Sequence, residues 1–353
     1  MRRCLLIVTI GALLLALRAP VRADSFLNDL FAQYADSLRR QASIPGMTTV
    51  IVGPDGGLYE SAYGLQDVER SVWARTDTPF HTDGLTQIFT AELLLRCAEG
   101  GRLEIDAPVG RFDAGSAEPD ATVRQLLTHT SASPAGLTFS YRPERLAPLT
   151  AVAKACNEES FRRTLARTLE RFAMRDSVPG PDAATMTPDV LGVFDKAGIE
   201  RYKAVLARLA TPYAVDRRGH ASRSDYPAKG LTAAAGLIST VDDLARFDLA
   251  LRDGLVLREE TLAASWQNPI SATGAPLPHA IGWFAQTYNG EPIVWQFGLA
   301  QNASSSLILK VPGRGLTLIM LANSDGLARP FSLAAGDVTD SPFARQFLRL
   351  FVY

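Results

Sequence analysis

Few residues in this chain could activate a nucleophile. A lysine one helical turn after a serine can accept the serine's proton, because side chains three residues apart share a helix face. Only five lysines occur among the 353 residues, at positions 154, 196, 203, 229 and 310. The residues three positions before them are Ala151, Val193, Glu200, Tyr226 and Leu307. No Ser, Thr or Cys stands at that spacing, so the chain contains no Ser-x-x-Lys pair.

The histidines do not suggest a metal site. The four of them, at positions 81, 129, 220 and 279, are far apart and lack the spacing of metal ligands. No GxGxxG loop, Walker loop or GxSxG elbow is present. We therefore expect neither a metal nor another cofactor.

The elements that must position these residues fall into blocks. Helical periodicity predicts an N-terminal helix over 27–38, a long helix near 84–99, a mainly helical region over 144–215 and a C-terminal helix with Ser341 as its N-cap. Strand patterns occur at 47–52, 58–63, 281–287, 293–297, 304–309 and 316–321. This order predicts an α+β fold, in which an antiparallel sheet is flanked by the N- and C-terminal helices and carries an inserted, mainly helical region.

The N-terminus has the pattern of a secretory signal peptide. Arg2 and Arg3 precede an uncharged run, residues 4–17, which is shorter than the ~20 residues of a membrane span. We expect cleavage after Ala23, with a membrane-retained signal anchor as the alternative. The mature domain would cover 24–353, with an α/β part at about 24–78 and 230–353 and a mainly helical part at about 79–229.

The composition limits the partners of the exported protein. The chain is 47% hydrophobic and 21% charged, which excludes a disordered chain. Signal cleavage would remove four arginines and no acid, so the formal net charge would change from −1 to −5. We expect a periplasmic or secreted protein with no nucleic-acid partner and no transmembrane span after cleavage. Export permits disulfides, but we favour two buried free thiols at Cys97 and Cys156.

Several segments together resemble the serine β-lactamase-related family, which includes class C β-lactamases, D-alanyl-D-alanine carboxypeptidases and esterases of the same fold. They occur in order between about residues 44 and 325. These segments are Ile44 to Met47, Tyr63-Gly64, Phe89 to Ala91, Glu99 to Leu103, Asp106 to Val109, Arg124 to Ser131, Gly236 to Thr240, Asp243 to Phe247, Ile281 to Trp283 and Leu318 to Asn323.

The resemblance implies a cleft in which three motifs meet. A Ser-x-x-Lys at the start of the long helix would supply the nucleophile and its base. A Tyr-x-Asn would supply a second proton-transfer group and an amide. A Lys- or His-x-Gly on a strand would supply positive charge, and backbone N–H groups would hold the oxyanion.

The corresponding positions depart from all three motifs. Gly84 stands at the position of the nucleophile and Gln87 at that of the lysine. The second motif reads Tyr141-Arg142-Pro143, which keeps the tyrosine but has Pro143 in place of the asparagine, and the third reads Gln296-Phe297-Gly298, which keeps Gly298 but lacks the cation. We expect Gly84 to act as a helix N-cap, with Gln87 completing half of a capping box.

These departures predict a non-catalytic member of the family, a pseudoenzyme with a ligand- or partner-binding cleft. The ligand would be a cell-wall peptide or a small carbonyl or carboxylate compound, held near Gly84, Tyr141, Arg142 and Gln296. Arg142 could pair with an anionic group. The sequence identifies no protein partner.

One alternative keeps catalysis. A serine hydrolase of the esterase, β-lactamase or peptidase type could act through a relocated nucleophile. The candidates are Thr86 on the long helix, and Ser131 with the nearby His129.

Overall fold

The computed structural model describes residues 22–188 and 192–353. Most of the predicted signal peptide, residues 1–21, lies outside the described residues. A seven-stranded antiparallel sheet forms the centre of the molecule, in the order β11-β12-β13-β14-β1-β2-β3. Its strands are β11 (Phe284–Tyr288), β12 (Glu291–Ala300), β13 (Ser304–Val311), β14 (Leu316–Ala322), β1 (Gly46–Val52), β2 (Leu58–Asp67) and β3 (Val72–Trp73).

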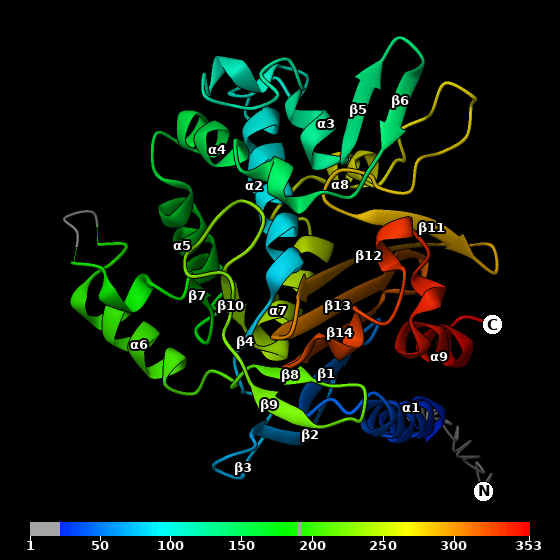
Figure 1. Cartoon of the computed structure of the whole chain (residues 1–353). Coiled ribbons are helices and arrows are strands. Elements are labelled where there is room, and N and C mark those ends of the chain that lie inside the picture. The colour runs from blue at the N-terminus through cyan, green and yellow to red at the C-terminus, as the bar shows by residue number, and fades with distance from the viewer. Residues whose placement is uncertain (1–21, 189–191) are drawn as a thin grey trace, which may run out of the picture.

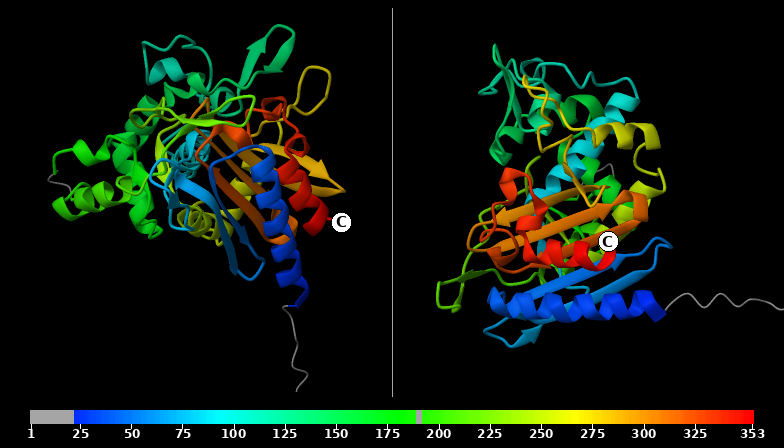
Figure 2. Two further views of the ribbon diagram at one scale, coloured as in Figure 1. Left: turned by 60° about the horizontal axis from the view of Figure 1, so that its bottom comes forward. Right: turned by 90° about the vertical axis from the view of Figure 1, so that its right-hand side faces the viewer.

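Alternate residues of each strand face opposite sides of the sheet, so two hydrophobic cores form. On β13, Leu307 and Leu309 face the core beneath the terminal helices α1 (Arg22–Gln41) and α9 (Pro342–Phe351), whereas Ile308 faces the core shared with α2 (Thr86–Glu99) and α7 (Val241–Arg252). Figure 2 shows α1 and α9 running side by side along one face. The sequence-based prediction of an antiparallel sheet flanked by both terminal helices is confirmed.

Most of the remaining helices lie in the segment between β4 and β10 (Figure 1). They are α3 (Val123–Leu127), α4 (Leu149–Asn157), α5 (Phe161–Arg171) and α6 (Lys196–Leu206), and α8 (Glu259–Ser265) follows later in the chain. Short strands complete the fold: β4 (Phe80–His81), β10 (Leu237–Ser239) and β7 (Val178–Pro179) form one sheet, and β5 (Thr130–Ser133) with β6 (Gly136–Phe139) and β8 (Tyr213–Val215) with β9 (Ala221–Arg223) form two hairpins. None of the helices in the described part of the chain is long and apolar enough to span a membrane.

Two of the three cysteines form a disulfide bond. Cys97 on α2 is joined to Cys156 on α4, with 6.2 Å between their Cα atoms. The prediction of two free thiols was wrong, because periodicity places both residues on helices but does not reveal that the two helices pack against each other.

Candidate functional site

Gly84, at the expected nucleophile position, lies in the single 3₁₀ turn η1 (Asp83–Leu85) directly before α2. Strand β12 crosses this turn so closely that a Cβ atom on residue 84 would lie 2.3 Å from the carbonyl oxygen of Phe297. Cβ atoms in proteins essentially never lie within 3.0 Å of such an atom. The backbone therefore leaves no room for a serine side chain unless β12 moves.

A second glycine makes this close approach possible. A Cβ atom on Gly298 would lie 2.3 Å from Oγ of Ser306 and 2.4 Å from the carbonyl oxygen of Thr82. Ser306 in turn donates a 2.7 Å hydrogen bond to that same Thr82 oxygen. Glycine at both positions thus lets β12 and β13 pack directly against the turn before α2.

Gln87, at the expected lysine position, is 1% exposed and joins two aromatic neighbours. Its Nε2 donates to the hydroxyl of Tyr141 at 3.0 Å, and its Oε1 lies 2.9 Å from Nε2 of His129. The expected capping box is absent: the N-cap residue of α2 is Leu85, and Gln87 is directed at side chains instead of backbone. The prediction of a cap at Gly84 and Gln87 was wrong because tertiary partners determine where this amide points.

The hydrogen bonds continue to Gln296, which stands at the expected cation position of the third motif. The hydroxyl of Tyr141 donates to Oε1 of Gln296 at 3.3 Å. Nε2 of Gln296 contacts Nε2 of His279 at 3.2 Å and donates to the carbonyl oxygen of Gly282 at 3.2 Å. Gln87, Tyr141 and Gln296, which are distant in sequence, therefore form one connected chain of hydrogen bonds.

The two histidines at the ends of this chain have defined proton positions. The backbone N–H of Arg142 donates to Nδ1 of His129 at 3.2 Å, so the proton of that ring is on Nε2 and is donated to Gln87. Nδ1 of His279 lies 2.7 Å from the carbonyl oxygen of Ala280, so Nδ1 carries the proton and Nε2 accepts from Gln296. From His129 to His279, each side chain therefore donates to the next, and all these hydrogen bonds have the same direction.

Burial keeps the titratable members of this chain uncharged. It lowers the pKa of His129 well below its usual value, assisted by the nearby His279 and Arg145, and it lowers the pKa of His279 to about 3. Burial also raises the pKa of the Tyr141 hydroxyl. At neutral pH these residues therefore include no imidazolium and no phenolate, and the expected lysine position carries the neutral amide of Gln87.

A cavity of about 360 Å³ lies beside Tyr141, the middle member of this chain of hydrogen bonds. Gly84, Tyr141 and Pro143 line it, so the cavity brings together these residues of the first two expected motifs. Its other walls are mostly apolar and include Phe297 and Leu299. Gln87 and Gln296 do not line this cavity and are fully buried. The arrangement can hold a small, largely apolar group, and Gly84 presents no nucleophilic side chain to it.

Asp83 is the one acidic residue of the cavity wall, and no sequence motif pointed to it. The residue is 4% exposed, and its carboxyl group accepts a 2.7 Å hydrogen bond from the hydroxyl of Ser304. Burial raises its pKa to about 7. Its position directly before Gly84 in the sequence was the signal that could have identified it as a residue of the site. For His279 no local signal existed, since it joins the site from a distant loop.

Arg142 faces away from this cavity. Its guanidinium group is directed at Glu118, at 3.8 Å, and it lines a different cavity together with Glu144 and Arg145. The structure therefore does not bring Arg142 together with Gly84 and Gln296.

The alternative nucleophiles are not placed for catalysis. Thr86 is fully buried, and its Oγ1 accepts from the N–H of Leu237 at 3.3 Å. Both ring nitrogens of His129 are bonded to partners other than Ser131. Neither candidate therefore has a base beside an accessible hydroxyl.

Comparison with known proteins supports a single family. The family model described as Beta-lactamase matches residues 27–340. Protein flp of Staphylococcus aureus strain MW2 is 24% identical over 323 residues, which cover 80% of this chain and 60% of flp. Esterase EstB of Burkholderia gladioli is 34% identical over 103 residues, or 27% of this chain and 26% of the esterase. The chain thus spans less than two thirds of these relatives.

The fold is also similar to that of solved structures. The D-alanine carboxypeptidase AmpC from Burkholderia cenocepacia superposes with a TM-score of 0.68 at 17% identity, covering 93% of this chain and 99% of that one. At this identity the match concerns the fold.

Proposed function

This chain belongs to the beta-lactamase family, and we propose that it is a non-catalytic member. It would be an exported homologue of the family's serine hydrolases that lacks the Ser-x-x-Lys dyad and uses its cleft to bind a ligand or partner. One observation carries the proposal. The backbone carbonyl of Phe297 occupies the space that a side chain on residue 84 would need.

The neutral hydrogen-bonded chain supports the same proposal. A serine nucleophile needs a base within hydrogen-bond reach or a neighbouring positive charge. Here the base position is Gln87, both of whose polar atoms are bonded, and the cation position is Gln296. Loss of nucleophile and base together costs on the order of 10⁶ in rate in a serine hydrolase.

The lining of the cleft favours one of the expected ligand types. A cell-wall peptide or other carboxylate would need a cation, but Arg142 lies at a separate cavity and Gln296 is neutral. A small carbonyl compound with an apolar substituent fits the walls formed by Phe297 and Leu299 better. We therefore place neutral carbonyl compounds ahead of carboxylates as candidate ligands.

The disulfide supports the proposed export. Disulfides persist in oxidising compartments and are rare in the cytosol of mesophiles. The bond between Cys97 and Cys156 is therefore in keeping with a periplasmic or secreted protein.

Labelling with a fluorescent penicillin tests the proposal directly. The purified mature protein should acquire no covalent label and should hydrolyse a p-nitrophenyl ester no faster than buffer does. The double variant Gly84→Ser with Gln87→Lys should also remain unlabelled, because the new Cβ meets the Phe297 carbonyl.

Comparing the wild-type protein with the double variant distinguishes the possible causes of inactivity. Labelling of the wild-type protein would overturn the proposal. Labelling of the double variant but not of the wild type would contradict the steric block at residue 84, because β12 would then have moved to admit the serine. It would leave the absent serine and lysine as the cause of inactivity.

A further inference from the structure

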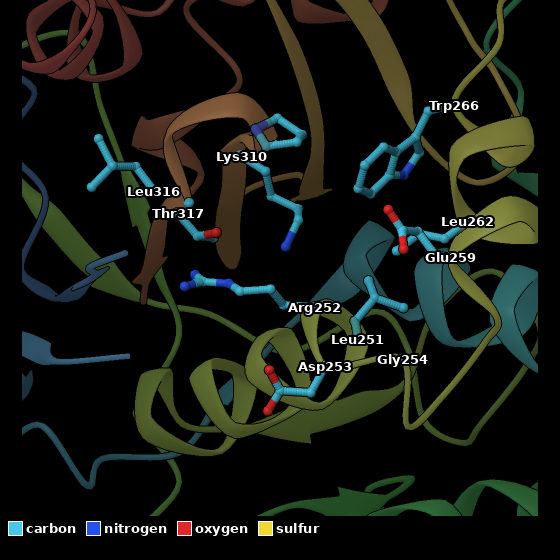
Figure 3. Close-up of a pocket in the computed structure, with 12 residues that line it drawn as sticks. Leu251, Arg252, Asp253, Gly254, Glu259, Leu262, Trp266, Lys310, Leu316 and Thr317 are labelled. Carbon is cyan, nitrogen blue, oxygen red and sulfur yellow. The ribbon is translucent and has the colours of Figure 1, made fainter. Parts of the chain in front are cut away.

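We propose that a second cavity binds a small carboxylate compound with an apolar body. This cavity, of about 390 Å³, lies between α7, α8 and the β13–β14 hairpin. Figure 3 shows the ammonium group of Lys310 pointing into it, with Arg252 on one side and Trp266 on the other. The proposal does not depend on the loss of catalysis at the first cleft.

The two cavities are separate places in the molecule. Strand β13 connects them: its first residue, Ser304, bonds Asp83 at the cleft, and Lys310 lies six residues farther along. At about 3.3 Å per residue, the two positions are about 20 Å apart.

Lys310 is unusual among the five lysines. The other four are exposed, whereas Lys310 is 5% exposed. Among the described residues its only hydrogen-bond partner is Asp248 on α7, itself 1% exposed. An ammonium group carries three donors, so two of them remain for another acceptor.

Arg252 adds a second positive charge beside the same carboxylate. Its Nη2 lies 3.5 Å from Asp248, and its Nη1 donates to the carbonyl oxygen of Gly53 at 2.8 Å. Two cations therefore share one buried anion. A carboxylate in the cavity would balance the remaining charge through charge-assisted hydrogen bonds.

The other nearby acids do not neutralise this charge. Glu92 on α2 is 1% exposed, and burial raises its pKa to about 8, so it is protonated at neutral pH. Asp253 and Glu259 also line the cavity, but both are exposed to solvent. Their interaction with a buried charge is weakened by water.

The remaining walls fit an apolar body better than a bare ion. Leu251, Leu262, Trp266, Pro312 and Leu316 line the cavity. The volume is within the range of small-molecule sites. An aliphatic or aryl carboxylate would place its head at Lys310 and Arg252 and its body against these side chains, which favours it over inorganic phosphate.

Calorimetric titration of the purified mature protein with octanoate tests this assignment. Octanoate should bind saturably, and octanamide, which has the same body without the charge, should bind at least about tenfold more weakly, a difference of about 1.4 kcal/mol. Arg252→Gln should weaken octanoate binding to a similar degree while leaving the Lys310–Asp248 pair in place. The control Arg258→Gln removes an exposed arginine that does not line the cavity and should leave binding unchanged.

Each contrary result would overturn the proposal. It fails if octanoate does not saturate at millimolar concentration, or if octanamide binds equally well. It also fails if inorganic phosphate binds as tightly as octanoate, because the site would then recognise an ion without an apolar body. Lys310→Met provides a second variant, whose folding is checked by circular dichroism before titration.

Discussion

At the scale of single residues, the amides at positions 87 and 296 explain how this buried site is stable without a charged side chain at either position. An amide both donates and accepts, so it can be inserted into a continuous chain of hydrogen bonds. Gln87 accepts from His129 and donates to Tyr141, and Gln296 accepts from Tyr141 and donates to His279. A lysine at either position could only donate, and it would leave the group that now donates to the amide oxygen, His129 Nε2–H or the Tyr141 hydroxyl, without an acceptor.

Asp83 makes stability depend on pH. Burial raises its pKa from 3.8 to about 7, so between these values the folded chain keeps a proton that the unfolded chain releases. The contribution of Asp83 to the free energy of unfolding therefore falls as pH rises from about 4 to 7, and it is constant above that range. Asp83→Asn should match the wild type near pH 4 and exceed it at pH 8 by on the order of 4 kcal/mol.

Urea unfolding at several pH values measures this difference. The comparison with wild type cancels the effect of the buried histidines, which act in the opposite direction as they charge at low pH. Asp120→Asn, at an exposed acid, is the matched control and should show no such trend. A difference between Asp83→Asn and wild type that is the same at pH 4 and pH 8 would contradict the assignment.

The sequence predicts part of this site. The segment that begins at Phe89 resembles the family's long helix, and counting back from it identifies Gly84 and Gln87 as the nucleophile and lysine positions. The structure places Gln87, Tyr141 and Gln296 in contact. The direction of Arg142 could not be predicted, because it depends on Glu118, which is distant in sequence.

At the scale of elements, the disulfide fixes α2 against α4. The bond joins Cys97 and Cys156, which are 59 positions apart in sequence. A cross-link over a loop of that size stabilises a protein by about 4 kcal/mol in the chain-entropy account. Replacing both cysteines by alanine should lower the free energy of unfolding by roughly 2–4 kcal/mol, measured by urea denaturation.

A thiol assay provides the independent check. The denatured, unreduced mature protein should contain no free thiol, and the reduced protein should contain two. Two free thiols in the unreduced protein would contradict the disulfide. The reduced wild type should unfold at the same urea concentration as the double alanine variant, which separates the bond from the packing of the cysteine side chains.

Element boundaries could be predicted where periodicity is long. The strand pattern over 47–52 corresponds to β1, and Ser341 caps α9 as expected. The strand expected at 281–287 begins later, at Phe284, because Gly282 has φ of +77° and lies against Ala91 of α2. Strands of two or three residues such as β4 have no detectable periodicity.

At the scale of the whole molecule, the two faces of the sheet differ in what they contact. On one face, β13 packs under α1 and α9 mainly through apolar residues such as Leu307 and Leu309. The other face of the same strand carries polar residues at both ends, Ser304 at the cleft and Lys310 at the second cavity. The polar residues at the two ends of this face therefore place a hydroxyl group at one cavity and an ammonium group at the other.

Export is the prediction that concerns the whole chain. When the full chain is produced in a Gram-negative host, the protein recovered from the periplasm should begin at Asp24, as measured by intact mass. Cleavage there removes the first two residues of α1 but keeps Phe31 and Ala35, which pack against the sheet, so the mature protein should stay folded. The variant Ala23→Phe should block cleavage, because the signal peptidase site requires a small residue. Recovery of a soluble cytosolic protein that begins at Met1 would contradict export, and an uncleaved, membrane-bound wild-type chain would favour the signal anchor instead.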